Sequence, residues 1–232
     1  MKAPVSSSNN LPRHIAIIMD GNRRWARKKG LAIIKGHRKV VEELVEELAD
    51  YCIKKGIKYL TLWAFSTENW NRDKKEVNLI MDLFREKLGK SIDQLHQKGV
   101  KVTSIGDLSR FDQDIREQIE EGIKKTQHNK NLTLTFALNY GGRDELLRTI
   151  NKLPSGEKIT QEIIDQNLDT AHFPNPDLII RPGGEKRLSG FLLWQSEYSE
   201  LYFSDILMPD FNEKELDKAI VKYQQRQRRF GK

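Results

Sequence analysis

Apolar runs and amphipathic stretches alternate along most of the chain. The run Ile15–Met19 is bounded by polar residues and has the length of a strand buried on both faces. Apolar residues from Val40 to Ile53 recur at helical spacing and stop at Gly56. By the same criteria, we expect further strands at 58–65, 100–105, 132–137 and 177–180, and helices at 40–56, 73–99, 112–127, 143–152, 160–168 and from 212.

This alternation predicts an α/β fold, a single domain with a mainly parallel central sheet flanked by helices. In such sheets, ligands bind beyond the carboxyl ends of the strands. Four polar segments follow predicted strands: Asp20–Arg24, Ser66–Arg72, Asn139–Gly142 and Arg181–Gly184. We therefore expect these four segments to meet at one edge of the sheet.

The segment that follows the first strand has the composition of a diphosphate site. Gly21 allows the backbone to approach a ligand closely, and Arg23 and Arg24 offer paired donors to phosphate oxygens. Asp20 is suited to hold a divalent cation between itself and those oxygens. A solvated basic turn at the end of a strand explains the same residues, so this segment alone does not decide between the two interpretations.

Composition narrows the classes of function. The net charge of +7 favours anionic partners: nucleic acid, acidic lipid or phosphorylated small molecules. The single cysteine, Cys52, excludes an intramolecular disulfide, and no apolar stretch approaches the roughly 20 residues of a membrane helix. Neither the P-loop pattern nor the Gly-x-Gly-x-x-Gly pattern of nucleotide-binding proteins occurs in the chain.

Seven short motifs occur in this order: Asp20–Ala26, Gly36-His37, Phe65–Arg72, Ile105–Asp107, Asn139–Gly142, Arg181–Ser189 and Glu200–Phe203. Each motif is weak alone, but together and in this order they resemble the cis-prenyltransferases, the undecaprenyl diphosphate synthase family. The resemblance covers roughly residues 14–231. It implies a single parallel-sheet domain with a hydrophobic product tunnel. We expect residues 1–12 to form a flexible N-terminal tail and residues 13–232 to form the catalytic domain.

The resemblance also implies an activity. We expect a Mg²⁺-dependent transferase that condenses isopentenyl diphosphate onto an allylic diphosphate of farnesyl or geranylgeranyl type. The product would be a long-chain polyprenyl diphosphate, a lipid-carrier precursor with new cis double bonds. We further expect a cytoplasmic homodimer that contacts a membrane peripherally at product release and does not bind nucleic acid.

Roles for individual residues follow from the resemblance. Asp20 matches the catalytic aspartate that carries Mg²⁺, and Glu200 matches a second metal-linked carboxylate. Asn69 matches the residue assigned to proton removal, although a neutral amide is a poor base and more plausibly positions the alkene. The implied substrate-binding residues are Gly21, Asn22, Arg23, Arg24, Trp25 and His37 on the allylic side, Arg181, Arg187, Leu188 and Ser189 on the isopentenyl side, and Ser66, Thr67, Glu68, Trp70 and Arg72 in the loop after the second strand.

Some of these residues have ordinary structural explanations. Trp25 and Trp70 have the character of core aromatics, and Arg187 that of a surface charge. The chain also departs from the family where Ile33 stands in place of a frequent arginine; Lys35 is the nearest cation, and whether it replaces that contact is left open by the sequence. The tail Arg229–Gly231 resembles a C-terminal motif that reaches into a partner subunit, but it also fits a basic helix end.

Two other functions remain open from the sequence. A non-catalytic subunit of the same family would lack Asp20, Asn69 or the tail, and all three are present. A basic nucleic-acid-binding protein fits the net charge. However, acidic residues interleave with the basic ones, and no RNA-binding signature occurs.

A last expectation concerns product length. Strand periodicity places Leu60, Leu62 and Ala64 on one face, with Trp63 and Phe65 on the other. We expect Ala64 to line the tunnel, with the apolar stripe 77–95 as the opposite wall. Leu132 or Leu134 would close the far end. The alternative is that Ala64 only allows a helix to pack closely.

Overall fold

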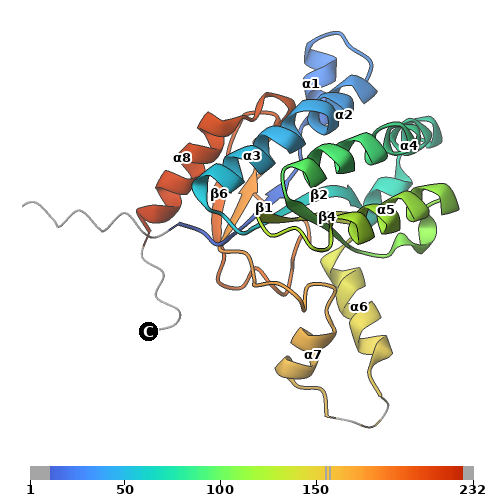
Figure 1. Cartoon of the computed structure of the whole chain (residues 1–232), viewed down its shortest axis with the longest axis vertical. Coiled ribbons are helices and arrows are strands. Elements are labelled where there is room, and N and C mark those ends of the chain that lie inside the picture. The colour runs from blue at the N-terminus through green and yellow to red at the C-terminus, as the bar shows by residue number, and fades with distance from the viewer. Residues whose placement is uncertain (1–10, 155, 157, 227–232) are drawn as a thin grey trace, which may run out of the picture.

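The computed structural model describes residues 11–226 except 155 and 157, and it contains one six-stranded sheet (Figure 1). The strands are β1 (His14–Ile18), β2 (Tyr59–Ser66), β3 (Val100–Ile105), β4 (Leu132–Tyr140), β5 (Leu178–Arg181) and β6 (Glu200–Phe203). The helices are α1 (Asn22–Lys28), α2 (Ile34–Lys39), α3 (Val45–Lys55), α4 (Lys74–Gln97), α5 (Gln113–Thr126), α6 (Gly142–Lys152), α7 (Gln161–Asn167) and α8 (Glu213–Gln224).

The sheet has the order β3-β4-β2-β1-β5-β6, and every neighbouring pair is parallel. This confirms the predicted parallel α/β fold. β1 lies between β2 and β5, and all five of its residues are buried, as expected of a strand covered on both faces. β6 was not predicted, because a four-residue, half-buried edge strand has too short a pattern to stand out.

Helices cover one face of the sheet, and irregular chain covers much of the other. On the first face, α3, α4 and α8 pack their apolar sides against β1, β2, β4 and β5. On the second face, Phe191 and Leu192 pack against the sheet from the turns that precede β6. The indole of Trp63 stacks on the ring of Phe191 with their centroids 5.0 Å apart.

Two predicted segments have more structure than expected. The stretch predicted as one helix at 40–56 belongs to a longer continuous rod, in which α2 passes through a π-helical turn (Val40–Leu44) into α3. The predicted polar loop after β2 is a 3₁₀ helix over Thr67–Asn71. Short 3₁₀ turns also occur at Leu108–Arg110 and Met208–Asp210.

The predicted alternation of faces along β2 is wrong at its end. Trp63 pairs with Ala137, but Phe65 pairs with Leu138, so β2 contains an extra residue at this point. A bulge of this kind breaks the period of two. As a result, Phe65 packs with Ala64 against Ile80 of α4 rather than on the face of Trp63.

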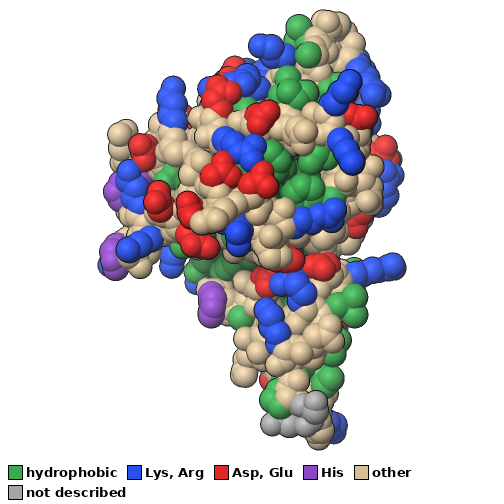
Figure 2. Space-filling model, turned by 90° about the vertical axis from the view of Figure 1, so that its right-hand side faces the viewer, with side chains coloured by type: hydrophobic (Ala, Val, Ile, Leu, Met, Phe, Trp, Pro, Cys, Tyr) green, Lys and Arg blue, Asp and Glu red, His purple; other side chains and the backbone are tan. Residues whose placement is uncertain are grey.

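The α6–α7 region projects from the body as an arm at the bottom of Figure 1. Figure 2 shows hydrophobic side chains on the surface of this arm. Leu147 and Ile150 of α6 are 62% and 41% exposed, and Leu193 nearby in the fold is 44% exposed. Within the described residues, no helix combines the length and the apolar character that crossing a membrane requires.

Candidate active site

A cavity of about 670 Å³ opens beyond the carboxyl ends of β1, β2 and β5, and we call it the polar cavity. It is lined by Ile18, Met19, Asp20, Gly21, Asn22, Arg23, Arg24, Arg27, His37, Trp63, Ala64, Phe65, Ser66, Glu68, Asn69, Arg72, Ile80, Arg181, Glu185, Arg187 and Ser189. Three of the four predicted polar segments therefore meet here. The fourth, Asn139–Gly142, does not line the cavity.

Asp20 lies at the centre of the ion pairs in this cavity. Its Oδ1 is 3.2 Å from Nη2 of Arg24 on α1, and its Oδ2 accepts a hydrogen bond of 3.0 Å from Nη2 of Arg181. The buried Arg181 also donates to Oγ of Ser189 at 3.0 Å and to the carbonyl of Arg187. One carboxylate thus links the segment after β1 to the segment after β5.

Two glycines allow these segments to approach each other. Gly21 has a φ of 102°, and a Cβ there would be 2.9 Å from the side chain of Leu207. Gly183 has a φ of 98°, and a Cβ there would be 2.8 Å from Nη2 of Arg24. Any other residue would meet both backbone strain and a clash, so the close packing around Asp20 requires glycine at both positions.

A second group of charges surrounds His37. Nη2 of Arg23 and Nη1 of Arg72 lie 3.4 Å and 3.0 Å from the carboxylate of Glu76. Burial, together with the nearby charges of Arg72 and Arg23, lowers the pKa of His37 from 6.5 to about 4. Its Nε2 is buried and has no hydrogen-bond partner among the described residues. The imidazole is therefore neutral at neutral pH, with one ring nitrogen available.

Asn69 is held by a capping box at the start of the 3₁₀ helix. Its Oδ1 accepts a hydrogen bond of 3.1 Å from the backbone N–H of Ser66, while the Ser66 side chain caps the backbone of Asn69 in return. The amide oxygen is thus already engaged. This arrangement fixes the orientation of the amide and suits a positioning role better than the role of a base.

Several predicted site residues do not line the polar cavity: Trp25, Thr67, Trp70, Leu188 and Glu200. The Trp25 indole donates to Oδ1 of Asp210 at 2.8 Å, and the Trp70 indole donates to Oδ1 of Asn139 at 2.8 Å. Each indole thus has its one polar atom bonded within the protein, as the structural alternative expects, and a substrate contact of either ring stays a prediction.

The structure does not bring Glu200 to Asp20. Glu200 begins β6 and pairs with Leu178, the first residue of β5, whereas Arg181 is at the other end of β5. Its carboxylate forms an ion pair with Arg226. Within the described residues of one chain, Glu200 and Asp20 therefore do not come together, and Glu200 as a second metal ligand stays a prediction.

The donor set still fits a magnesium ion completed by substrate. No group of three or more histidine, cysteine or acidic residues suited to a metal occurs within the described residues. Magnesium commonly takes one or two carboxylates and fills its remaining positions with water and substrate phosphates. Asp20, among arginines suited to a diphosphate, matches that pattern.

A second cavity of about 70 Å³ lies behind the first, and we call it the apolar cavity. It is lined by Met19, Val41, Val45, Ala64, Leu83, Phe84, Lys87, Leu88, Ser91, Ile92, Leu95, Val102, Thr103, Ser104, Ile119, Phe136 and Leu138. Ala64 and Met19 line both cavities. The predicted stripe on α4 supplies one wall, but Leu132 and Leu134 line neither cavity and pack in the core.

Comparisons with known proteins agree with this geometry. The family model described as "Prenyltransf: Putative undecaprenyl diphosphate synthase" matches residues 18–231. The chain belongs to this prenyltransferase family. It is 50% identical to an isoprenyl transferase of Clostridium perfringens, over 96% of this chain and 91% of that protein. It is 48% identical to the ditrans,polycis-undecaprenyl-diphosphate synthase ((2E,6E)-farnesyl-diphosphate specific) of Pasteurella multocida, over 96% of both chains.

Solved structures give the same family. Lavandulyl diphosphate synthase from Lavandula x intermedia, in complex with dimethylallyl diphosphate, matches with a TM-score of 0.91 and 34% identity over 96% of this chain and 99% of that one. A probable undecaprenyl diphosphate synthase from Campylobacter jejuni matches with a TM-score of 0.78 and 36% identity, over 97% and 100%. The protein is thus a prenyl-group transferase of the cis type.

The prenyltransferase site contains two charged residues that the sequence analysis did not assign to it. Glu185 lines the polar cavity and forms ion pairs with Arg187 and Arg24. Arg27 lines it from the last turn of α1. Its position four residues after Arg23 was a usable signal, because residues at that spacing share a helix face. Lys35, the candidate to replace the arginine missing at Ile33, is exposed and does not line the cavity.

Proposed function

We propose that this prenyltransferase makes a long-chain polyprenyl diphosphate by repeated cis addition of isopentenyl diphosphate to farnesyl diphosphate, with Mg²⁺. The observation that carries the proposal is the pair of adjoining cavities. One contains six arginines, and the other is almost wholly apolar; Ala64 lines both. A diphosphate head and an isoprenoid tail require surroundings of these two kinds, next to each other.

The condensation breaks the bond between the allylic carbon and the diphosphate oxygen. The alkene of isopentenyl diphosphate attacks that carbon, a new carbon–carbon bond forms, and one proton leaves. Arg23, Arg72 and Arg24 stabilise the charge that develops on the departing diphosphate. Asn69 orients the alkene, and the released diphosphate or water accepts the proton.

Asp20 would hold the magnesium ion together with diphosphate oxygens. The bound ion would partly neutralise the negative charge of the phosphate groups. We assign the binding of isopentenyl diphosphate to Arg181, Arg187 and Ser189. Because Asp20 forms an ion pair with Arg181, the proposed metal site adjoins this second substrate site. Glu200 is left out of this metal site for a single chain, because its carboxylate pairs with Arg226.

The apolar cavity is the proposed entrance of the product tunnel. Ala64 and Met19 form the boundary between head and tail, and Leu83, Phe84 and Leu88 of α4 form part of the wall. An extended prenyl chain requires a dry path of this kind. At about 70 Å³ the cavity must widen as the chain grows.

We also propose a homodimer that meets a membrane at product release. The exposed Leu147 and Ile150 of α6 offer a surface for a second copy. The stretch from Gly21 to Val41 contains eight basic and no acidic residues, and Lys28, Lys29 and Leu31 within it are exposed. Exposed cations beside an apolar side chain suit an anionic lipid headgroup layer. The tail Arg229–Gly231 lies outside the described residues.

The decisive experiment supplies the full chain with farnesyl and isopentenyl diphosphates and Mg²⁺, then sizes the products after removal of the diphosphate. We expect a ladder of polyprenols that ends at one main length, and no product when the metal is chelated. Geranylgeranyl diphosphate as an alternative starter tests the preference for farnesyl. Absence of any elongated product with either starter would contradict the proposal.

A further inference from the structure

Six arginines line the polar cavity, and five of them are already paired with carboxylates. Arg23 and Arg72 pair with Glu76, Arg24 and Arg181 pair with Asp20, and Arg187 pairs with Glu185. The sixth, Arg27, forms no ion pair with any residue that the structure describes. It therefore presents the one uncompensated guanidinium among the described arginines of this cavity.

The position of Arg27 directs it to one part of the cavity. It lies in the last turn of α1, four residues after Arg23 and three after Arg24, so it shares a face of the helix with both. Arg23 in turn lies close enough to His37 to lower the pKa of that imidazole. Arg27 is exposed and lines the cavity, so it lies at the rim, on the helix face that carries Arg23 and Arg24.

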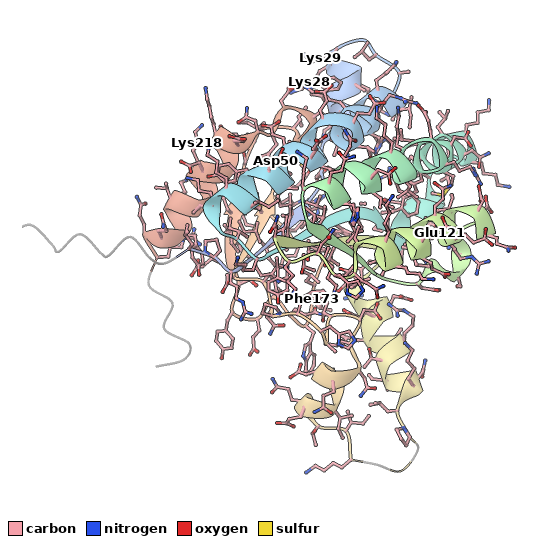
Figure 3. The ribbon with its side chains drawn as sticks, in the orientation of Figure 1. Lys28, Lys29, Asp50, Glu121, Phe173 and Lys218 are labelled. Carbon is pink, nitrogen blue, oxygen red and sulfur yellow. The ribbon has the colours of Figure 1, made fainter. Side chains whose placement is uncertain are left out.

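The three lysines that lie near Arg27 in the sequence do not line the polar cavity. Lys28 and Lys29 lie at the same end of α1, at the top of Figure 3, and neither lines the cavity. Lys35 follows on α2 and is also exposed without lining it. Of these four neighbouring cations, Arg27 is therefore the one that lines the cavity.

We propose that Arg27 binds the diphosphate of the allylic substrate and supplies the cation that is missing at Ile33. This inference rests on the proposed function. The paired arginines must exchange a carboxylate partner for phosphate oxygens when substrate binds. Arg27 gives up no such partner, so its contact with phosphate adds to affinity with no ion pair broken. Its exposed position also leaves its guanidinium open to an entering anion.

A purely structural explanation exists for Arg27. A cation in the last turn of a helix interacts favourably with the helix dipole. In that case, replacement would lower the melting temperature and leave anion affinity unchanged. The two explanations therefore differ in what they predict for binding.

The test uses the full chain with Arg27→Gln, the conservative Arg27→Lys, and Lys35→Gln as a matched control. Lys35→Gln removes one positive charge from the same basic segment, outside the cavity. Calorimetry measures Kd for inorganic diphosphate and for farnesyl thiodiphosphate, and steady-state kinetics measures KM for each substrate. We expect Arg27→Gln to raise both Kd values and the allylic KM about tenfold, within the range of a charge-assisted hydrogen bond. We expect kcat to stay within about twofold, because the contact is made in the ground state as well.

Arg27→Lys should show a smaller rise, and Lys35→Gln a change below about twofold. Equal changes in Arg27→Gln and Lys35→Gln would overturn the inference, because they would indicate a general field effect. A rise confined to the KM for isopentenyl diphosphate would overturn it as well, as would a lower melting temperature with unchanged Kd.

The failure of the proposed function has a separate signature. If the wild-type chain does not elongate farnesyl diphosphate, the proposed function fails. The titrations with inorganic diphosphate still show whether Arg27 is an anion-binding residue. If the wild-type chain elongates farnesyl diphosphate and Arg27→Gln binds diphosphate normally, only the inference about Arg27 fails.

Discussion

The two cavities that meet at Ala64 are prepared for their ligands to different degrees. The polar cavity, at about 670 Å³, is open, and its groups are held by ion pairs, glycine turns and a capping box. The apolar cavity, at about 70 Å³, is too small for a long chain as it stands. The difference teaches that the charged groups are positioned before a ligand binds, whereas under the proposed function the helices around the apolar cavity would have to move to make room for the product.

The largest effect is expected at the centre of the polar cavity. Asp20→Ala removes the carboxylate that pairs with Arg24 and Arg181, and with it the proposed metal ligand. We expect kcat to fall by about 10²–10³ or more, because charge on the diphosphate is greatest in the transition state. The Kd of isopentenyl diphosphate, measured by calorimetry, should change far less. The isosteric Asp20→Asn should behave in the same way, and an unchanged kcat in either variant would end the mechanistic assignment.

The next effect tests the boundary between the cavities. Ala64→Leu should shorten the main product, since added methylenes would block the entrance of the apolar cavity. Product sizing measures this. Ala137→Leu is the matched control: it is a buried alanine on the neighbouring strand β4, and it lines neither cavity. It should cost about 1–3 kcal/mol of stability by overpacking and leave product length unchanged. If the Ala64→Leu variant is less stable but makes products of the original length, the prediction that Ala64 lines the tunnel is wrong.

A smaller effect distinguishes the fully buried His14 from His37, which lines the polar cavity. The pKa values of both His37 and His14 are lowered from 6.5 to about 4, chiefly by burial. Because these values lie below the ordinary one, the neutral rings contribute stability that is fully present above pH 6.5 and is lost as pH falls towards 4. Two nearby arginines also depress the pKa of His37, whereas the ring of His14 is bonded to Pro174 and Thr61.

We expect bound diphosphate to raise the pKa of His37 by about one unit, or roughly 1.4 kcal/mol, because phosphate charge offsets Arg23 and Arg72. The pKa of His14 should stay near 4. NMR titration of the imidazole protons, with and without inorganic diphosphate, measures both. Equal movement of the two histidines, or no movement of His37, would contradict the view of the polar cavity as the anion site.

The smallest effect is expected at the charged edge of the apolar cavity. Lys87 lines this cavity and forms ion pairs with Glu42 and Glu86. Lys87→Gln should lower the free energy of unfolding only slightly, because ion pairs near the surface contribute little to stability. It should leave the Kd of diphosphate unchanged. Denaturant titration and calorimetry measure the two quantities. Weaker diphosphate binding would show that a cation of the apolar cavity also contributes to anion binding in the polar cavity.

Much of the fold and the core of the site could be predicted because they follow from one topological rule. Asp20 and Arg181 are far apart in sequence, yet each follows a central parallel strand, and the carboxyl ends of such strands meet. The segment Ser66–Arg72 was placed beside them for the same reason. The resemblance then assigned residue roles that no spacing rule contains.

The remaining features depend on contacts that a pattern does not carry. The extra residue between Trp63 and Phe65 shifts one register without changing the hydrophobic character of the strand, so periodicity could not reveal it. The indole of Trp25 is directed by Asp210, a partner far away in sequence. Lys35 and Arg27 are both basic and close together in the sequence, and only the path of the backbone between α1 and α2 decides which one faces the cavity.

The continuous rod formed by α2, the π-helical turn and α3 borders both cavities. His37, near one end, borders the polar cavity, while Val41 and Val45, one and two turns further on, border the apolar cavity. Close-packed interiors transmit displacement with little loss. Under the proposed function, a growing prenyl chain that displaces the valines would also shift the imidazole of His37, because one continuous rod carries all three side chains. Product length and diphosphate binding would then be linked through the backbone of that rod.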